Sequence, residues 1–179
     1  GIGPEIIAKL FDQEAPADCV VYGDAPTLAR TVAQLGVALE VQPVNGPAAC
    51  SGARVMPVIQ ACDQLPDDLP LGECSAMAGK AAYQCIDRAI TDALAGKTHG
   101  LVTAPINKKS IEMAGFDFPG HTEILAHRCG DVPVAMMLAN EQIRTVLVTI
   151  HIPLAAVSQT LTIAAERQVG CFYAEFPLK

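Results

Sequence analysis

The sequence lacks basic runs, paired cysteines and long apolar runs, and each absence excludes a class of protein. The longest basic run is Lys108-Lys109 and the net charge is −7, so the clustered cations that a nucleic-acid backbone requires are missing. The seven cysteines form no C-x-x-C pair, which argues against a zinc ribbon or a disulfide framework and favours a reducing compartment. No apolar run approaches the roughly 20 residues of a membrane-spanning helix. We therefore expect a cytoplasmic protein with no nucleic-acid partner and no membrane partner.

Apolar residues nevertheless make up 51% of the 179 residues, which is enough to bury a core in one domain or slightly more. Short apolar runs alternate with longer helical stretches. The pattern predicts helices at residues 4–11, 26–35, 75–96, 108–113, 122–128 and 155–161, strands at 19–22, 37–41, 100–104, 134–138 and 145–150, and a loop at 43–54. Such alternation predicts an α/β fold with a largely parallel sheet, and the close succession of the last two strands predicts a hairpin.

His151 directly follows the apolar run 144–150, and Pro153 ends the predicted strand there. Ligands of open α/β sheets bind beyond the carboxyl ends of strands, and a neutral imidazole is a common metal ligand. His151 is therefore a candidate metal ligand. The alternative is a histidine that only forms a hydrogen bond at a strand end.

The segment Gly120-His121-Thr122-Glu123 combines a sharp turn with the start of a helix. Free backbone amides at a helix N-terminus favour an anion such as phosphate or carboxylate, so His121 and Thr122 are candidate substrate-binding residues. The alternative is simple capping by Thr122. His127 lies about 120° around the helix from His121, so the two do not form the i, i+4 pair of a zinc site, and we expect His127 to be partly exposed.

Residues 103–108, with the sequence TAPINK, place polar groups at the end of another predicted strand. Lys108 can bind a phosphate or a carboxylate, and Asn107 beside it is a second, weaker candidate. The alternative is a helix N-terminus with a solvated lysine. No cofactor-binding residues are predicted, because the glycines of residues 1–5 are too few and too close for a G-x-G-x-x-G fingerprint.

Six segments occur in order along the chain: GIGPEI, SAMAGKAAYQCIDRAI, GLVTAPINKKSI, FPGHTEILA, VAMMLA and HIPLAAV. Together they resemble the 4-hydroxythreonine-4-phosphate dehydrogenase family of vitamin B6 (pyridoxal phosphate) biosynthesis, over most of residues 1–163. The resemblance implies the fold of the isocitrate and isopropylmalate dehydrogenases. That fold has α/β/α layers, a mixed and mostly parallel sheet, and a cleft between two lobes.

The resemblance also implies a reaction, which is the oxidation of 4-phosphohydroxy-L-threonine by NAD or NADP followed by loss of CO₂ to give 3-amino-2-oxopropyl phosphate. It implies a divalent metal (Zn, Mg or Co), because a metal polarises the carbonyl of a β-keto acid that loses CO₂. By the same resemblance, His121 and Thr122 contact the phosphorylated substrate and His151 is the first metal ligand. The family enzyme is a homodimer with its active site near the subunit interface.

Parts of the family pattern are absent from the sequence. The segments resembling NPHAGE and HDQG, which carry two further metal-binding histidines, do not occur, and neither does the GDPAG turn that precedes GIGPEI. We therefore predict that residues 1–163 are an incomplete dehydrogenase, the N-terminal half without its first strand. Residues 164–179 are predicted to be a divergent tail from a truncated, frameshifted or partial reading frame. Because Gly1 stands where a Met is usual, we also expect the native start to be missing.

Three hypotheses for function remain open at this point. The first is the dehydrogenase named above, and the second is a relative that oxidises a phosphorylated sugar acid such as threonate or erythronate 4-phosphate. The third is an inactive truncated homologue. A catalytic zinc site typically has three protein ligands, and His151 alone does not supply them, so we expect this chain by itself to be inactive.

Overall fold

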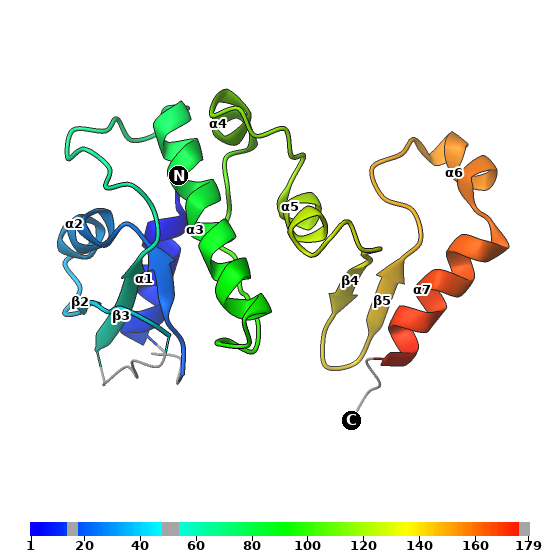
Figure 1. Ribbon diagram of the computed structural model, residues 1–179, viewed down its shortest axis with the longest axis horizontal. Helices are drawn as coiled ribbons and strands as arrows, with labels where there is room; N and C mark the ends of the chain where they lie inside the picture. The colour runs from blue at the N-terminus through cyan, green and yellow to red at the C-terminus, as the bar shows by residue number, and fades with distance from the viewer. Residues whose placement is uncertain (14–17, 48–53, 176–179) are drawn as a thin grey trace. The chain divides into compact units, whose positions relative to one another are not determined.

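The computed structural model describes residues 1–13, 18–47 and 54–175. Its elements in chain order are α1 Gly3–Gln13, β1 Val21–Gly23, α2 Ala25–Leu35, β2 Glu40–Pro43, β3 Val55–Gln60, α3 Ala76–Leu94, α4 Lys108–Met113, α5 His121–Arg128, β4 Met136–Ala139, β5 Arg144–Leu147, α6 Leu154–Thr160 and α7 Ile163–Glu175 (Figure 1). They form two compact units, Gly1–Gly130 and Asp131–Lys179. The fold is α/β, and all six predicted helices are present.

The first unit contains a parallel sheet in the order β1-β3-β2. Its central strand, β3, was not predicted from the sequence. Residues 56–59 of β3 are all buried, because the strand is covered on both faces, so it lacks the polar alternation that marks a half-exposed strand. It also contains Pro57, which argues against a central strand in a sequence pattern. Half of the predicted loop at 43–54, namely residues 48–53, lies outside the described residues.

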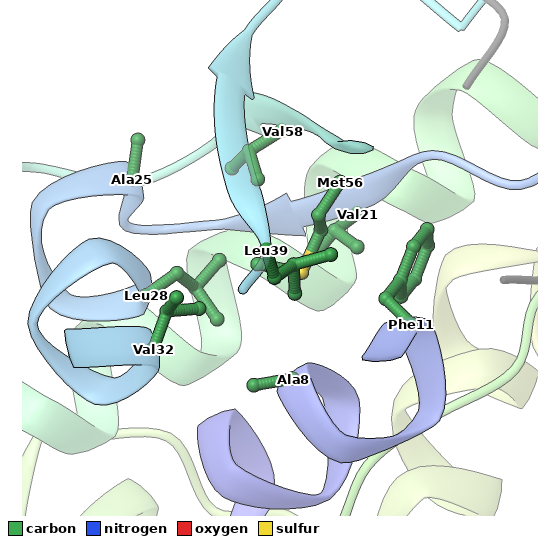
Figure 2. Close-up of a cluster of buried hydrophobic side chains, with 9 residues drawn as sticks. All are labelled: Ala8, Phe11, Val21, Ala25, Leu28, Val32, Leu39, Met56 and Val58. Atoms are coloured by element: carbon green, nitrogen blue, oxygen red, sulfur yellow. The ribbon is translucent and has the colours of Figure 1, made fainter. Parts of the chain in front are cut away.

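Helices cover both faces of this sheet. Successive strand residues point to opposite faces, and β1 shows this with two neighbours: Val21 packs into the core formed with α1 and α2, whereas the Tyr22 hydroxyl donates a hydrogen bond to Asp92 of α3. Figure 2 shows the first core, which consists of Ala8, Phe11, Val21, Ala25, Leu28, Val32, Leu39, Met56 and Val58. The first unit therefore has α/β/α layers, with α1 and α2 on one face and α3 on the other.

Two strand predictions in the first unit need correction. The strand predicted at 37–41 lies instead at Glu40–Pro43. Residues 100–104, predicted as a strand, form no regular element, and Val102 is 97% exposed. A strand requires a neighbour to pair with, and the sheet that the described residues form does not include this segment.

A second apolar cluster lies between α3 and α5. Ile86 and Ile90 of α3 pack with Ile124 of α5, and partly buried side chains from the intervening segment pack around them: Tyr83, Leu101, Ile106, Phe118 and Leu125. Arg128 adds an ion pair, its Nε lying 2.5 Å from Asp87 Oδ1. These contacts fix α5, and with it the GHTE segment, against α3.

The second unit contains the predicted antiparallel hairpin of β4 and β5, in which Met136 pairs with Leu147. Helices α6 and α7 follow. β5 ends at Leu147 rather than at residue 150, so His151 does not directly follow the strand as we expected. The division of the chain at residue 163 and the frameshifted tail stay predictions. Across both units, none of the helices in the described part of the chain has the length and apolar character needed to cross a bilayer.

Candidate functional site

Asn107 caps the N-terminus of α4. Its Oδ1 accepts a hydrogen bond from the backbone N–H of Ser110 at 2.9 Å, which satisfies one of the amides that a helix start leaves without a partner. The Ser110 hydroxyl in turn accepts a hydrogen bond from the Ser75 amide at 3.2 Å, at the start of α3. This places Lys108, the first residue of α4, at a fixed point beside α3. The role seen for the Asn107 side chain is therefore to hold Lys108 in place.

Lys108 lies against the N-terminus of α5, close to Gly120. A Cβ at position 120 would lie 3.8 Å from Lys108 Cε, 3.9 Å from Lys108 Nζ and 3.3 Å from Glu123 Oε2. Gly120 is the N-cap of α5, and no side chain caps this helix. The first backbone N–H groups of α5 therefore remain available to an anion, with the lysine ammonium beside them.

His121 is the first residue of α5, and its ring is held from the backbone of the TAPINK segment. Burial lowers its pKa below the ordinary value of 6.5, and the nearby Lys108 cation lowers it further, while a hydrogen bond to the Ala104 backbone acts in the opposite direction. Nε2 is buried and has no hydrogen-bond partner among the described residues. The ring nitrogen bonded to Ala104 is therefore Nδ1. Neutral His121 then presents Nε2 as an acceptor.

Thr122 and His127 differ from His121 in their surroundings. Thr122 is half-buried in the first turn of α5, next to His121. His127 is exposed, and its ring centroid lies 5.5 Å from that of Phe118. The predicted exposure of His127 is therefore confirmed. Thr122 stays a candidate substrate-binding residue, because it lies in the same helical turn as the uncapped backbone N–H groups of α5.

A small pocket of about 260 Å³ adjoins this helix start and is lined by Lys108, Glu112, Phe116, Asp117, Phe118 and Pro119. A larger pocket of about 530 Å³ lies elsewhere, between α3 and the segment at residues 63–65. The larger pocket contains none of the candidate residues, and its single ammonium group, that of Lys80, is already paired with Asp63 at 2.8 Å. We therefore place the candidate site at the start of α5, where the Lys108 ammonium lies close to the uncapped helix start.

His151 belongs to the second unit, Asp131–Lys179. Its backbone has a φ of 58° and its side chain is exposed. Within the described residues no three His, Cys, Asp or Glu side chains are grouped so that they could hold a metal ion. The described chain thus offers one candidate ligand, which does not fit a divalent-metal site of three or more protein ligands. It likewise offers no glycine-rich turn of the dinucleotide type.

Sequence reasoning missed one contributor to the site. Ala104 supplies the backbone oxygen that orients the His121 ring. Any residue type provides a backbone carbonyl, so the sequence contains no signal for this contact. Only the approach of the 101–107 segment to α5 shows it.

Comparison with known proteins shows the family of this chain. The sequence model described as "Pyridoxal phosphate biosynthetic protein PdxA" matches residues 15–174. The chain belongs to this family. The 4-hydroxythreonine-4-phosphate dehydrogenase of Beijerinckia indica is 43% identical over 171 residues, which are 94% of this chain and 50% of that protein. The enzyme of the same name from Trichlorobacter lovleyi is 37% identical over 88% of this chain and 48% of its own length.

Solved structures agree with the assignment to the PdxA family. A 4-hydroxythreonine-4-phosphate dehydrogenase from Klebsiella pneumoniae matches with a TM-score of 0.86 and 38% identity, covering 94% of this chain and 52% of that one. A terephthalate 1,2-cis-dihydrodiol dehydrogenase from Burkholderia xenovorans matches with a TM-score of 0.67 and 26% identity, covering 96% of this chain and 51% of that one. The chain thus spans about half the length of the relatives it matches.

Proposed function

We propose that this chain forms the substrate-binding part of an oxidoreductase that acts on 4-phosphohydroxy-L-threonine in pyridoxal phosphate biosynthesis. One observation carries the proposal: His121 Nε2 is buried without a partner among the described residues, at a helix start where no side chain caps the amides. The dehydrogenase name of the relatives supports the reaction class. Their name also supports a phosphorylated substrate.

The roles of the residues follow from their chemistry. The backbone amides at the start of α5 and the Lys108 ammonium together favour an anionic substrate group, either the phosphate or the carboxylate. Neutral His121 accepts a hydrogen bond at Nε2 from a substrate hydroxyl or ammonium group. Thr122, with a hydroxyl that both donates and accepts, holds a neighbouring polar group. Such contacts hold a substrate in register for reaction.

We further propose that the complete enzyme uses NAD or NADP and a divalent metal (Zn, Mg or Co), and that it works as a homodimer. The family name of the relatives supports a nicotinamide cofactor in general terms. The described residues by themselves complete neither a metal site nor a dinucleotide site. The remaining metal ligands and the dinucleotide contacts are therefore expected from other residues of a longer form or from a second subunit. His151 is proposed as the one metal ligand that this chain contributes.

Two alternatives follow from particular observations. A solved structure at 26% identity is named a terephthalate 1,2-cis-dihydrodiol dehydrogenase. That name supports substrate variation among similar chains, so a sugar acid such as threonate or erythronate 4-phosphate is a second candidate substrate. The lack of a grouped metal site in the described residues favours an inactive homologue as the third candidate. Measured binding distinguishes the two candidate substrates, and measured turnover distinguishes an active enzyme from an inactive homologue.

The test is calorimetric titration of the 179-residue chain with 4-phosphohydroxy-L-threonine and, separately, with erythronate 4-phosphate. Lys108→Ala is compared with Lys109→Ala, which removes the neighbouring exposed lysine. We expect Lys108→Ala to weaken binding roughly 10- to 150-fold, since a hydrogen bond to a charged group contributes about 1.5–3 kcal/mol. We expect Lys109→Ala to bind like the parent chain. Equal weakening by both variants would refute the site. Preferential binding of erythronate 4-phosphate would select the second substrate.

A further inference from the structure

Two cysteine thiols lie together outside the candidate site, where the chain leaves β3 and passes over α3. Cys62 is the second residue after β3, and Cys85 lies in the middle of α3. Both are half-buried, both are free thiols, and their side chains form a hydrogen bond with each other. The sequence alone indicates no role for either cysteine, because the two are 23 positions apart and belong to no paired motif.

The residues that flank these cysteines are tied to one another. The Asp63 backbone N–H donates to Gln84 Oε1 at 3.1 Å, and Asp63 Oδ2 accepts hydrogen bonds from Gln84 Nε2 at 3.2 Å and from Lys80 Nζ at 2.8 Å. On the other side, Gln60 Nε2 donates to the Cys62 carbonyl at 2.9 Å. The backbone at Cys62 is therefore held against the turn of α3 that carries Cys85. Hydrogen bonds of the flanking residues therefore hold the two cysteine-bearing segments next to each other.

The environment makes the two sulfurs chemically different. The hydrogen bond from Cys85 lowers the pKa of the Cys62 thiol, against the opposing effects of burial and of the carboxylates Asp24 and Asp63. The same hydrogen bond, together with burial, raises the pKa of Cys85. Gln60 Nε2 also donates to Cys62 Sγ at 3.9 Å, a contact that favours the thiolate, which is the reactive form of cysteine. Cys62 is therefore assigned as the nucleophile of the pair and Cys85 as the partner that resolves the oxidised product.

We propose that Cys62 and Cys85 form an oxidant-sensitive dithiol that closes to an intramolecular disulfide when the chain meets hydrogen peroxide. The Cys62 thiolate attacks one peroxide oxygen, the O–O bond breaks, and Cys62 becomes a sulfenic acid while hydroxide leaves. The Cys85 sulfur then attacks the Cys62 sulfur, forming the S–S bond. The sulfenic hydroxyl leaves with the Cys85 proton as water. Two thiols and one peroxide thus give one disulfide and two waters, and the two electrons lost by the sulfurs reduce the peroxide.

The disulfide would join the carboxyl end of the central strand to the helix that covers one face of the sheet. It would close a loop that includes the segment between β3 and α3, which carries Asp63 and lines the larger pocket. Such a bond fits a reducing compartment as a transient state, formed under oxidative stress and reversed by thiol exchange. It is independent of the proposed substrate site, which contains neither cysteine.

Tryptic peptide mapping of the full 179-residue chain tests the proposal. Cleavage after Arg54, Lys80 and Arg88 places Cys62 in peptide 55–80 and Cys85 in peptide 81–88. Peptide 55–80 also contains Cys74, so the chain is compared with Cys74→Ser, in which Cys62 is the remaining cysteine of that peptide. After treatment with hydrogen peroxide, free thiols are blocked and the digest is analysed by mass spectrometry. The wild-type chain is mapped in parallel, so that the result does not depend on the folding of a variant.

We expect the two peptides to appear joined, about 2 Da lighter than their sum because two hydrogen atoms are lost, and separated again by dithiothreitol. The joined species should persist in Cys74→Ser and disappear in Cys62→Ser and in Cys85→Ser. Three results would each overturn the proposal: Cys85 recovered fully alkylated after oxidation, Cys62 converted to sulfinic acid without a cross-link, or Cys62 joined to Cys74 or Cys129 instead.

Discussion

Gly79 of α3 faces the backbone of Ser110 in α4 so closely that no other side chain fits at position 79. A Cβ there would overlap the Ser110 carbonyl group and lie 2.7 Å from the Ile111 amide nitrogen. The contact brings α4 directly onto α3, and the position of α4 determines where Lys108 meets the start of α5. One glycine in the long helix thus controls the geometry of the candidate site.

The first prediction is that Gly79→Ala destabilises the chain by more than about 3 kcal/mol, because the obstacle is backbone and cannot rotate away. In an unobstructed helix the same change stabilises by about 1 kcal/mol. Gly170→Ala in α7 is the matched control, since position 170 has no neighbouring heavy atom within 4 Å. Urea denaturation measures both. A Gly79→Ala variant as stable as the parent would contradict the close packing of α3 and α4.

A second prediction concerns Tyr22, whose hydroxyl donates to the buried carboxylate of Asp92 at 3.0 Å. Burial and the hydrogen bond to Asp92 raise the pKa of Tyr22 to about 12. Folding therefore favours the protonated phenol, and the stability that this contributes is present below pH 10.0 and is lost as the pH rises toward 12. Spectrophotometric titration should show this late ionisation. It should vanish in Tyr22→Phe and persist in Tyr83→Phe.

The third prediction uses the lowered pKa of His121. The unfolded chain binds this proton more readily than the folded chain does. The stability contributed by the neutral ring is therefore present above pH 6.5, the ordinary value, and is lost as the pH falls below it. His121→Gln does not titrate, so its loss of stability between about pH 7.5 and about pH 5 should be smaller than that of the parent. His99→Gln, at an exposed position, should keep the parental pH dependence. If His121→Gln keeps it too, the ring is not held neutral by burial.

The fourth prediction is that the 179-residue chain binds divalent metal weakly and does not reduce NAD. The described residues contain no group of three side chains suited to a metal ion, and a lone exposed imidazole such as that of His151 binds zinc poorly. Zinc titration by calorimetry should give no tight stoichiometric binding, and His151→Ala should weaken the residual binding more than His99→Ala does. Tight binding of one zinc per chain would show that a complete site exists.

A fifth prediction compares the local stability of the two units. No residue between 131 and 171 is buried, and several apolar side chains there are exposed, including Leu138, Ile143, Leu154 and Ile163. Few buried apolar contacts mean a low free energy of local opening. Backbone amides of β4 and β5 should therefore exchange with deuterium at least roughly 10-fold faster than those in the middle of α3. Equal protection of the two units would show a second core of comparable stability.

Much of the fold could be predicted from the sequence because helix formation is a local matter. Apolar periodicity and turn residues lie within a few positions of the elements that they define, and all six predicted helices and the hairpin are present. Helix α7, which lies where a divergent tail was expected, was not predicted. The strand predictions failed at β3 and at residues 100–104 for one shared reason. Whether an apolar run pairs as a strand depends on which neighbours the chain brings beside it, and those neighbours are distant in sequence.

For the candidate site, the sequence alone determined which residues carry useful chemistry: a glycine, a histidine and a threonine at a helix start, and a lysine after TAPIN. The family segments belong to the same category, since they depend on residue order alone. The tertiary structure decided which of these groups meet. Lys108 reaches the start of α5, and Ala104 holds the His121 ring, because α4 and α5 both pack on α3. Burial and the nearby ammonium, which lower the pKa of His121, exist only after that packing has excluded water and brought the charges together.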